Sequence, residues 1–232
     1  DHPRALRFEC LSWKAIDGLL QEGHDLLILP LVATEQHGPH LPINTDTLIA
    51  TRVCEYASAI AQVPVLPTIG YTVSEGHTTK WLGTFSLKHQ TFIQTLNDLV
   101  DWAVSSGWKR LLMVNSHFGN DAPMRVAVDQ LRLRHLGELQ IAAFNTFFLS
   151  PEIKEKFVED AEDLHANKAE TDLMLYLAPE TVDMAMVEDD PDRTVSHVFS
   201  YPVAQSSLNG VTGRPSLGNA ADGEQLFHLI GE

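Results

Sequence analysis

Short apolar runs alternate with amphipathic segments along most of the chain. The runs 26–32, 63–69, 111–114 and 139–144 are rich in branched apolar residues and are bounded by polar ones, which is typical of buried strands. Pro64 and Pro67 interrupt the second run, and proline cannot donate a hydrogen bond to a neighbouring strand. We therefore expect residues 63–69 to form a strand near an edge of the sheet.

The segments between these runs predict helices, because their apolar residues recur every three or four positions. We expect helices over 12–21, 47–61, 89–106, 164–178 and 224–230, and another from about residue 121. The charged segment 150–163 suits either a solvated helix or a mobile flap over a site, and we favour the helix. Strand and helix thus alternate from end to end, which predicts an α/β fold with a mainly parallel sheet.

Length and charge restrict the class of protein. With 232 residues the chain can bury one core, and it contains no repeat, low-complexity tract or linker, so we predict a single domain over residues 1–232. A formal charge of −15 would repel a phosphate backbone and excludes nucleic acid as a natural partner. No apolar run could cross a membrane, and residues 1–4 lack signal-peptide character. Two cysteines give no disulfide framework, so we expect a cytoplasmic protein.

Candidate metal ligands follow the first apolar run. Glu35, His37 and Asp46 lie on one connection, which Pro39 and Pro42 stiffen. Carboxylates and imidazole together suit divalent ions, and a carboxylate such as Asp46 can bridge two of them. The dipole of the helix expected from residue 47 also favours the charged form of Asp46. Taken singly, Glu35 is better explained as a surface acid, His37 as a loop histidine and Asp46 as a helix cap.

A second histidine follows another strand. The run 111–114 leads into Asn115-Ser116-His117-Phe118-Gly119-Asn120, and the carboxyl ends of parallel strands meet at one edge of a sheet. We therefore expect His117 near the first ligand loop. The chain has no HExxH, GxSxG or Walker motif, which leaves a zincin protease, a serine hydrolase and a nucleoside triphosphatase without support.

The string Glu35-x-His37-Gly38-Pro39-His40-Leu41-Pro42, with Thr45-Asp46, closely resembles the signature of the creatininase family of metal-dependent amidohydrolases. Three other places are also similar to the family pattern. They are 115–120, His165-Ala166 with Glu170-Thr171, and 210–213 with Gly223. The resemblance spans nearly the whole chain. It implies a three-layer αβα sandwich with a mainly parallel central sheet.

The resemblance further implies two divalent metal ions per chain. Zinc, manganese or iron is expected, and magnesium also tolerates such ligands. One ion would bind Glu35, Asp46 and His117, and the other His37 and the bridging Asp46. Creatininase carries a glutamate where this chain has Gly119. Glu170 is then the candidate for the missing oxygen ligand.

Catalysis and substrate binding are also implied by the resemblance. Two ions can lower the pKa of a shared water, whose hydroxide would attack an amide carbonyl, while His165 would protonate the leaving nitrogen. His165 and Glu170 are thus expected as catalytic residues. Ser74, Glu75 and His77, on a loop that borders the active site in the family, are expected to bind substrate together with Asn120. The alternative for His165 is a solvent-facing histidine at a helix terminus. The alternative for the loop that carries Ser74, Glu75 and His77 is an ordinary surface loop.

The leading functional hypothesis is hydrolysis of a C–N bond in a small cyclic amide or formamide. Creatinine itself is disfavoured, because the tryptophans that creatininase places near its substrate loop have no match between Phe147 and Asp163. Hydrolytic C–C cleavage of a keto-cyclitol by the same site is the runner-up. A metal-stabilised assembly protein without turnover is the third reading. The family habit implies a homo-oligomer, specifically a hexamer, that acts on a small molecule.

Overall fold

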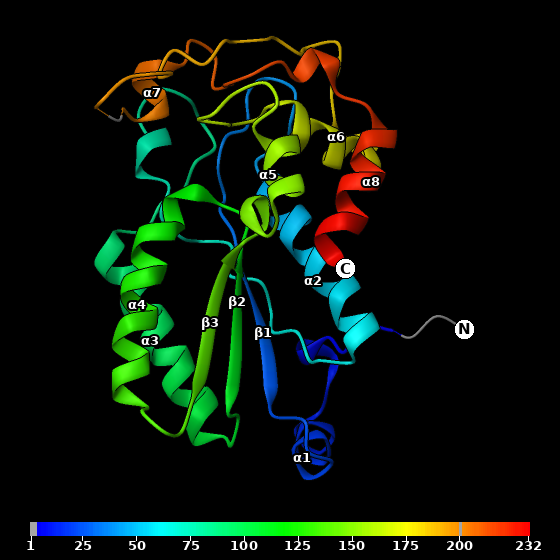
Figure 1. The fold of residues 1–232 in the computed structure, drawn as a ribbon, viewed down its shortest axis with the longest axis vertical. Coiled ribbons are helices and arrows are strands. Elements are labelled where there is room, and N and C mark those ends of the chain that lie inside the picture. The colour runs from blue at the N-terminus through cyan, green and yellow to red at the C-terminus, as the bar shows by residue number, and fades with distance from the viewer. Residues whose placement is uncertain (1–3, 200) are drawn as a thin grey trace.

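A parallel sheet of three strands forms the centre of the computed structural model, which describes residues 4–199 and 201–232 (Figure 1). The strands are β1 (Leu26–Leu31), β2 (Arg110–Asn115) and β3 (Gln140–Asn145), in the order β1-β2-β3. The register places Leu31 opposite Asn115 and Asn115 opposite Asn145. All three strands therefore end at the same edge, where the connections after them meet.

Helices cover both faces of this sheet. The α-helices of the described residues are α1 (Trp13–Gln21), α2 (Thr45–Ala61), α3 (His89–Ser105), α4 (Asp121–Arg134), α5 (Pro151–Phe157), α6 (Lys168–Leu177), α7 (Val203–Ser206) and α8 (Ala220–Gly231). Figure 1 shows α3 and α4 on one side of the strands and α2 on the other. The predicted three-layer αβα sandwich is confirmed. Within the described ranges, no helix combines the length and hydropathy needed to cross a bilayer.

The two faces of β1 explain this layering. Leu27, Leu29 and Leu31 are buried in one cluster with apolar residues of α3 and α4, whereas Ile28 packs with Cys54 of α2. Successive side chains of a strand point to opposite faces, so a fully apolar strand must be covered on both. Burying each such side chain contributes about 1.5–3 kcal/mol, which fixes β1 at the centre of the molecule.

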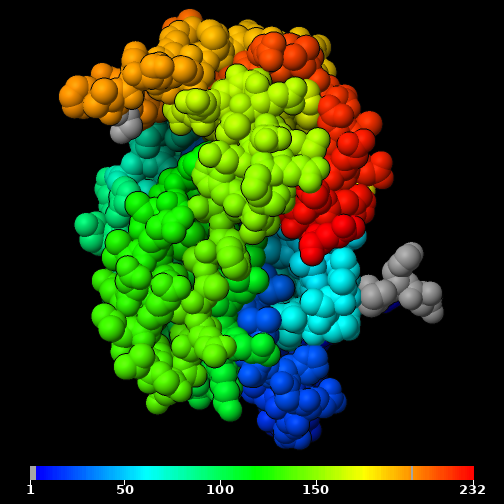
Figure 2. All heavy atoms as spheres, in the orientation of Figure 1, coloured from blue at the N-terminus to red at the C-terminus, as the bar shows by residue number. Residues whose placement is uncertain are grey.

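A second apolar core holds the C-terminal third of the chain against α2. Figure 2 shows α8, in red, packed beside α5 and α2. The residues of α2, α5, α6 and α8 that are buried in this second core are Ile49, Val53, Ile153, Phe157, Leu173, Met174, Leu226, Phe227 and Ile230. After β3 no further strand follows in the described part of the chain. The predicted alternation from end to end is therefore wrong beyond Asn145, because helices cover one another there.

The segment 63–69 is not a regular strand, contrary to prediction. It runs beside β1 through isolated parallel bridges, in which Val65 pairs with Ile28 and Ile69 with Leu31. The Leu66 N–H donates to the Ile28 carbonyl at 2.8 Å, but the prolines at 64 and 67 have no N–H to continue the ladder. The segment lies near the edge of the sheet, as predicted, but is not itself the edge, because Val65 also pairs with Arg7 on the side away from β1. The prolines explain the broken pairing.

Three helix boundaries differ from prediction, and a capping side chain decides two of them. Helix α2 begins two residues early, so Asp46 lies inside its first turn rather than before it. Helix α6 begins only after Asn167, whose side chain accepts from the Glu170 N–H, and the preceding His165 is in extended backbone paired with Thr212. Helix α8 likewise begins early, because the Asn219 side chain caps it.

The segment 150–163 is helical only over α5, and that helix is not fully solvated. Ile153 and Phe157 are buried beneath it, while the charged residues face outward. Two other predicted apolar stripes are also only partly buried, since Trp13 of α1 is 73% exposed and Ile60 of α2 is 58% exposed. The periodicity of apolar residues therefore located these helices but did not show which of those residues are buried.

The close contact between α6 and α8 leads to a prediction about stability. A Cβ at Gly223 would lie 1.9 Å from the Asp172 carbonyl oxygen, a backbone atom that cannot move alone. We expect Gly223→Ala to lower the free energy of unfolding by about 2–3 kcal/mol. Urea denaturation measures this free energy.

Gly18→Ala is the matched control. A Cβ at Gly18 would meet no atom within 4 Å. We expect this helical substitution to raise the free energy of unfolding by about 0.5–1 kcal/mol. Equal effects of the two substitutions would contradict the packing argument.

Candidate metal centre

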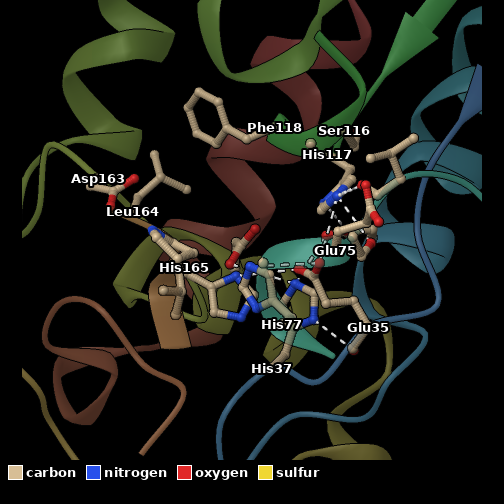
Figure 3. Close-up of a pocket in the computed structure, with 18 of the residues that line it drawn as sticks. Glu35, His37, Glu75, His77, Ser116, His117, Phe118, Asp163, Leu164 and His165 are labelled. Carbon is tan, nitrogen blue, oxygen red and sulfur yellow. Dashed lines mark hydrogen bonds and ion pairs between the residues drawn. The ribbon is translucent and has the colours of Figure 1, made fainter. Parts of the chain in front are cut away.

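A cavity of about 590 Å³ opens where the connections after the strands meet. Its polar lining comes from the β1–α2 connection, the loop 73–77, the β2–α4 connection and the segment before α6. Figure 3 shows Glu35, His37, His77, His117 and His165 converging on this cavity. Phe118, Phe147, Leu164, Tyr201, Pro202 and Val203 also line it. An acidic and imidazole-rich floor thus lies beneath walls that are partly apolar.

The first group of candidate ligands joins Asp46 to His117 and Glu35. Asp46 Oδ2 lies 3.1 Å from His117 Nδ1, and Glu35 Oε2 lies 3.5 Å from His117 Nε2. One ligand atom from each of the three residues fits within 4.8 Å of the others. The structure therefore brings together the three residues that the sequence assigned to one ion.

The second group surrounds His37. Its Nε2 lies 3.0 Å from Asp46 Oδ1 and 3.9 Å from Glu170 Oε2. Since Asp46 directs one oxygen to each of two histidines, it occupies the position of a bridging carboxylate. His37 and Glu170 also form a compact three-donor group with His165. Glu170, the candidate for the oxygen ligand that Gly119 does not supply, therefore lies beside this group.

A backbone carbonyl orients each of the two clustered histidines. His37 Nδ1–H donates to the Glu35 carbonyl at 3.1 Å, and His117 Nε2–H donates to the Val73 carbonyl at 2.8 Å. A carbonyl only accepts, so the proton on that ring nitrogen is fixed. The opposite nitrogen then faces an Asp46 oxygen in each case. This is the arrangement that metal-binding histidines usually have.

Electrostatics tie these groups to one another. Burial alone would lower the pKa of His37, but the Asp46 carboxylate outweighs it and raises that pKa to about 10. The pKa of His117 is likewise raised to about 9, because the charges of Glu35 and Asp46 outweigh the lowering effect of burial. Burial raises the pKa of Glu170 to about 7, while burial of Asp46 is outweighed by the histidines, which hold its pKa below the usual range. Without a metal, protons take the place of the cation.

Two buried carboxylate oxygens face only the ring nitrogens of the clustered histidines. Glu35 Oε2 and Asp46 Oδ2 accept no hydrogen bond in the described structure, although both residues are 1% exposed. A buried carboxylate is costly unless a positive charge faces it, and a divalent cation would supply that charge when the histidines are neutral. Residue types and positions therefore fit metal ions at this centre.

His165 and His77 complete the cluster on the side of the cavity away from Asp46. His165 Nδ1 lies 3.5 Å from Glu35 Oε1, and His77 Nε2 lies 3.7 Å from Glu35 Oε2. Burial lowers the pKa of both rings, that of His165 well below its usual value. Both imidazoles are therefore neutral near pH 7. The solvent-facing reading of His165 is wrong, since this residue is 7% exposed.

Gly119 leaves no room for a side chain. A Cβ there would lie 2.2 Å from the Val73 carbonyl oxygen and 2.5 Å from His117 Nε2. Both are atoms of the hydrogen bond that orients His117. With this backbone, a glutamate at position 119 is excluded, which is consistent with Glu170 as the additional carboxylate near His37.

The four predicted substrate-binding residues lie in different surroundings. Ser74, Glu75 and His77 line the cavity, although Glu75 also pairs with Lys88 and His89 at its rim. Asn120 is absent from the lining. It is fully buried and donates to the Val32 carbonyl at 3.0 Å, while it accepts from the Val73 N–H at 3.2 Å. Its position thus supports the backbone around the cavity rather than a direct contact with substrate.

Two contributors escaped sequence reasoning. The Gln36 side chain lies between His77 and His165, at 3.0 and 3.1 Å from their ring nitrogens. The Val73 carbonyl orients His117. Gln36 could have been noticed, because it stands between two candidate ligands in the sequence. A backbone carbonyl has no sequence signal.

Comparison with known proteins identifies the family. The family model "Creatininase: Creatinine amidohydrolase" matches residues 9–232. Creatinine amidohydrolase of Pseudomonas putida is 28% identical, over 94% of this chain and 90% of that protein. Mycofactocin precursor peptide peptidase of Mycolicibacterium smegmatis is 32% identical, over 87% and 79%. A mutant creatininase described as Zn-Zn type superposes with a TM-score of 0.84 at 25% identity, covering 98% of this chain and 94% of that one. The chain therefore belongs to the creatininase family of metal-dependent amidohydrolases.

Proposed function

We propose that this protein hydrolyses an amide C–N bond in a small molecule, either a cyclic amide or a formamide, with two divalent metal ions. Glu35, Asp46 and His117 would hold one ion, and His37, Asp46 and Glu170 the other. The observation that carries this proposal is the buried Asp46 at the floor of an open cavity, with one oxygen directed to His37 and the other to His117.

The ions would supply a water of lowered pKa and a charge that polarises the substrate carbonyl. His165 is the residue that we propose to move the proton. Its Nε2 lies 2.9 Å from the Gln36 backbone carbonyl, which can only accept, so the proton is on Nε2. Nδ1 then faces Glu35 and the cavity with a free lone pair.

A neutral His165 suits both halves of a hydrolysis. Nδ1 accepts a proton from the attacking water as the new C–O bond forms. The same proton then passes to the leaving nitrogen as the C–N bond breaks, so His165 ends neutral again. The lowered pKa of His165 keeps its lone pair available near neutral pH.

The relatives support this reaction class. One is named for amide hydrolysis and the other for peptide cleavage, and both names denote cleavage of an amide-type C–N bond. The creatininase described as Zn-Zn type makes zinc the first metal to try. A cavity of about 590 Å³ suits a small molecule.

A turnover screen tests the proposal. The protein is loaded with Zn²⁺, Mn²⁺ or Fe²⁺ and offered creatinine, other cyclic amides, N-formyl compounds, short peptides and a keto-cyclitol. We expect a new amine from an amide or formamide and a strict need for metal. Ring opening of the keto-cyclitol alone would replace the proposal by C–C hydrolysis. Two bound metal ions without turnover of any compound would favour a metal-stabilised assembly protein.

A further inference from the structure

We propose that Gln36 fixes His77 in the tautomer that carries its proton on Nε2, and that His77 donates this N–H to the carbonyl oxygen of the substrate. In this assignment Gln36 is a positioning residue and His77 a catalytic one. The inference rests on the proposed function for its second half. Its first half concerns only the hydrogen bonds of this chain.

The orientation of the Gln36 amide is determined by a backbone donor. The Gly38 N–H donates to Gln36 Oε1 at 2.9 Å, so the oxygen must be at that end of the amide. Gln36 Nε2 is then the atom 3.0 Å from His77 Nδ1. An amide nitrogen only donates, so His77 Nδ1 accepts and the ring proton is on Nε2.

The surroundings of Gln36 leave it little freedom. The Gln36 side chain is buried, and the backbone N–H of Gln36 donates to Thr84 Oγ1 at 3.0 Å. Gly210 closes over the amide, since a Cβ there would lie 2.2 Å from Gln36 Oε1. Gly210 also has a φ of +83°, which favours glycine. A side chain held on three sides can impose a tautomer on its neighbour.

His77 Nε2 has no hydrogen bond within the described residues. The nearest carboxylate oxygen is the unpartnered Glu35 Oε2, at 3.7 Å, which is beyond hydrogen-bonding distance. His77 also lines the cavity. Its N–H therefore remains available to a molecule in the cavity. The same proton makes Nε2 unable to bind a metal ion, although Glu35, His77 and His165 lie close enough to form a three-donor group.

Gln36 gives the two neighbouring histidines opposite polarities. The rings of His77 and His165 lie 4.4 Å apart. The Gln36 amide nitrogen is 3.1 Å from His165 Nε2, but the Gln36 backbone carbonyl is nearer, at 2.9 Å, and fixes the proton there. His165 thus presents a lone pair and His77 presents a proton. Amide hydrolysis needs such a pair, an acceptor for the proton of water and a donor for the oxygen that becomes negative.

The tautomer is tested on the zinc-loaded protein with ¹⁵N-labelled histidine. Long-range ¹H–¹⁵N correlation spectra should show His77 with its proton on Nε2, assigned by its loss in His77→Gln. Gln36→Glu keeps the shape and an acceptor for Gly38 but presents an oxygen to His77 Nδ1. We expect the proton to move to Nδ1 in that variant. A wild-type His77 with its proton on Nδ1, or with Nε2 bound to zinc, would overturn the inference.

Catalysis by His77 is tested with the best substrate of the screen. We expect His77→Leu and Gln36→Glu to lower kcat by about 10²–10³-fold with zinc content unchanged. His77→Gln places an amide N–H near the position of Nε2 and should retain kcat within about tenfold. Gln225→Glu, at an exposed site of α8, controls for the added charge.

The outcomes separate the two halves of the inference. Unchanged kcat in His77→Leu, or a loss explained by missing zinc, would remove the catalytic role. A panel without any turnover would remove that role together with the proposed function. In that case the histidine spectra still decide whether Gln36 fixes the tautomer.

Discussion

Replacing Asp46 by alanine should leave the protein unable to hold either metal ion and lower its turnover by at least about 10³-fold. Asp46 directs Oδ1 toward His37 at 3.0 Å and Oδ2 toward His117 at 3.1 Å. Within the described cluster, no other residue places a separate oxygen beside each of these two histidines. The loss of Asp46 removes an oxygen ligand from each site and leaves the histidines without the carboxylate that they face. Elemental analysis after dialysis against low metal, with turnover of the best substrate, measures both effects.

A graded pair of variants makes this result specific. Asp46→Asn retains the shape and one carbonyl oxygen but not the charge, and we expect it to lose the second equivalent of metal before the first. Asp129→Asn removes a charge from a side chain that is 79% exposed on α4 and should keep full metal content. Two equivalents of metal in Asp46→Ala would show that Asp46 does not bridge the sites.

Metal binding near pH 7 should release about two protons per chain, and the apparent affinity should rise by up to about 100-fold per pH unit. His37 has a pKa raised to about 10 and His117 one raised to about 9, so both are imidazolium at pH 7 in the metal-free protein. A metal ion must displace these protons, because only a neutral ring nitrogen can bind it.

The sign and range of this dependence follow from the pKa values. A raised pKa means that protons compete at neutral pH and cease to compete as pH passes about 9 to 10, so affinity increases with pH and then levels off. Below about pH 7, Glu170 is also protonated, which steepens the dependence. Competition with a fluorescent chelator gives the affinity at each pH.

Calorimetry in two buffers of different ionisation enthalpy gives the proton count directly. The release of no protons at pH 7, or an affinity independent of pH, would show that metal binds away from His37 and His117. His89→Gln, at a half-exposed site on the cavity rim, is the control and should release as many protons as the unmodified protein.

Local sequence located β1, β2, β3 and most helices because strands and helices bury residues with different periods. It failed where long-range contacts overrule periodicity. The proline-rich segment 63–69 runs beside β1 without forming a regular strand. His165 is extended rather than helical because it pairs with Thr212, a residue 47 positions away that no window of sequence includes.

The sequence by itself determined the chemistry of the site and its approximate place. Glu35, His37, Asp46 and His117 could be recognised because their motifs resemble those of the creatininase family. Parallel strands bring the residues beyond their carboxyl ends to one edge of the sheet, which predicted that these side chains meet. Only the tertiary structure decided which nitrogen of His77, His117 and His165 faces the cavity. That choice depends on the Val73 carbonyl and on Gln36, which meets His77 and His165 across separations of 41 and 129 residues. Hydrogen-bond direction is a property of positions in space, and so it emerges only when the chain has folded.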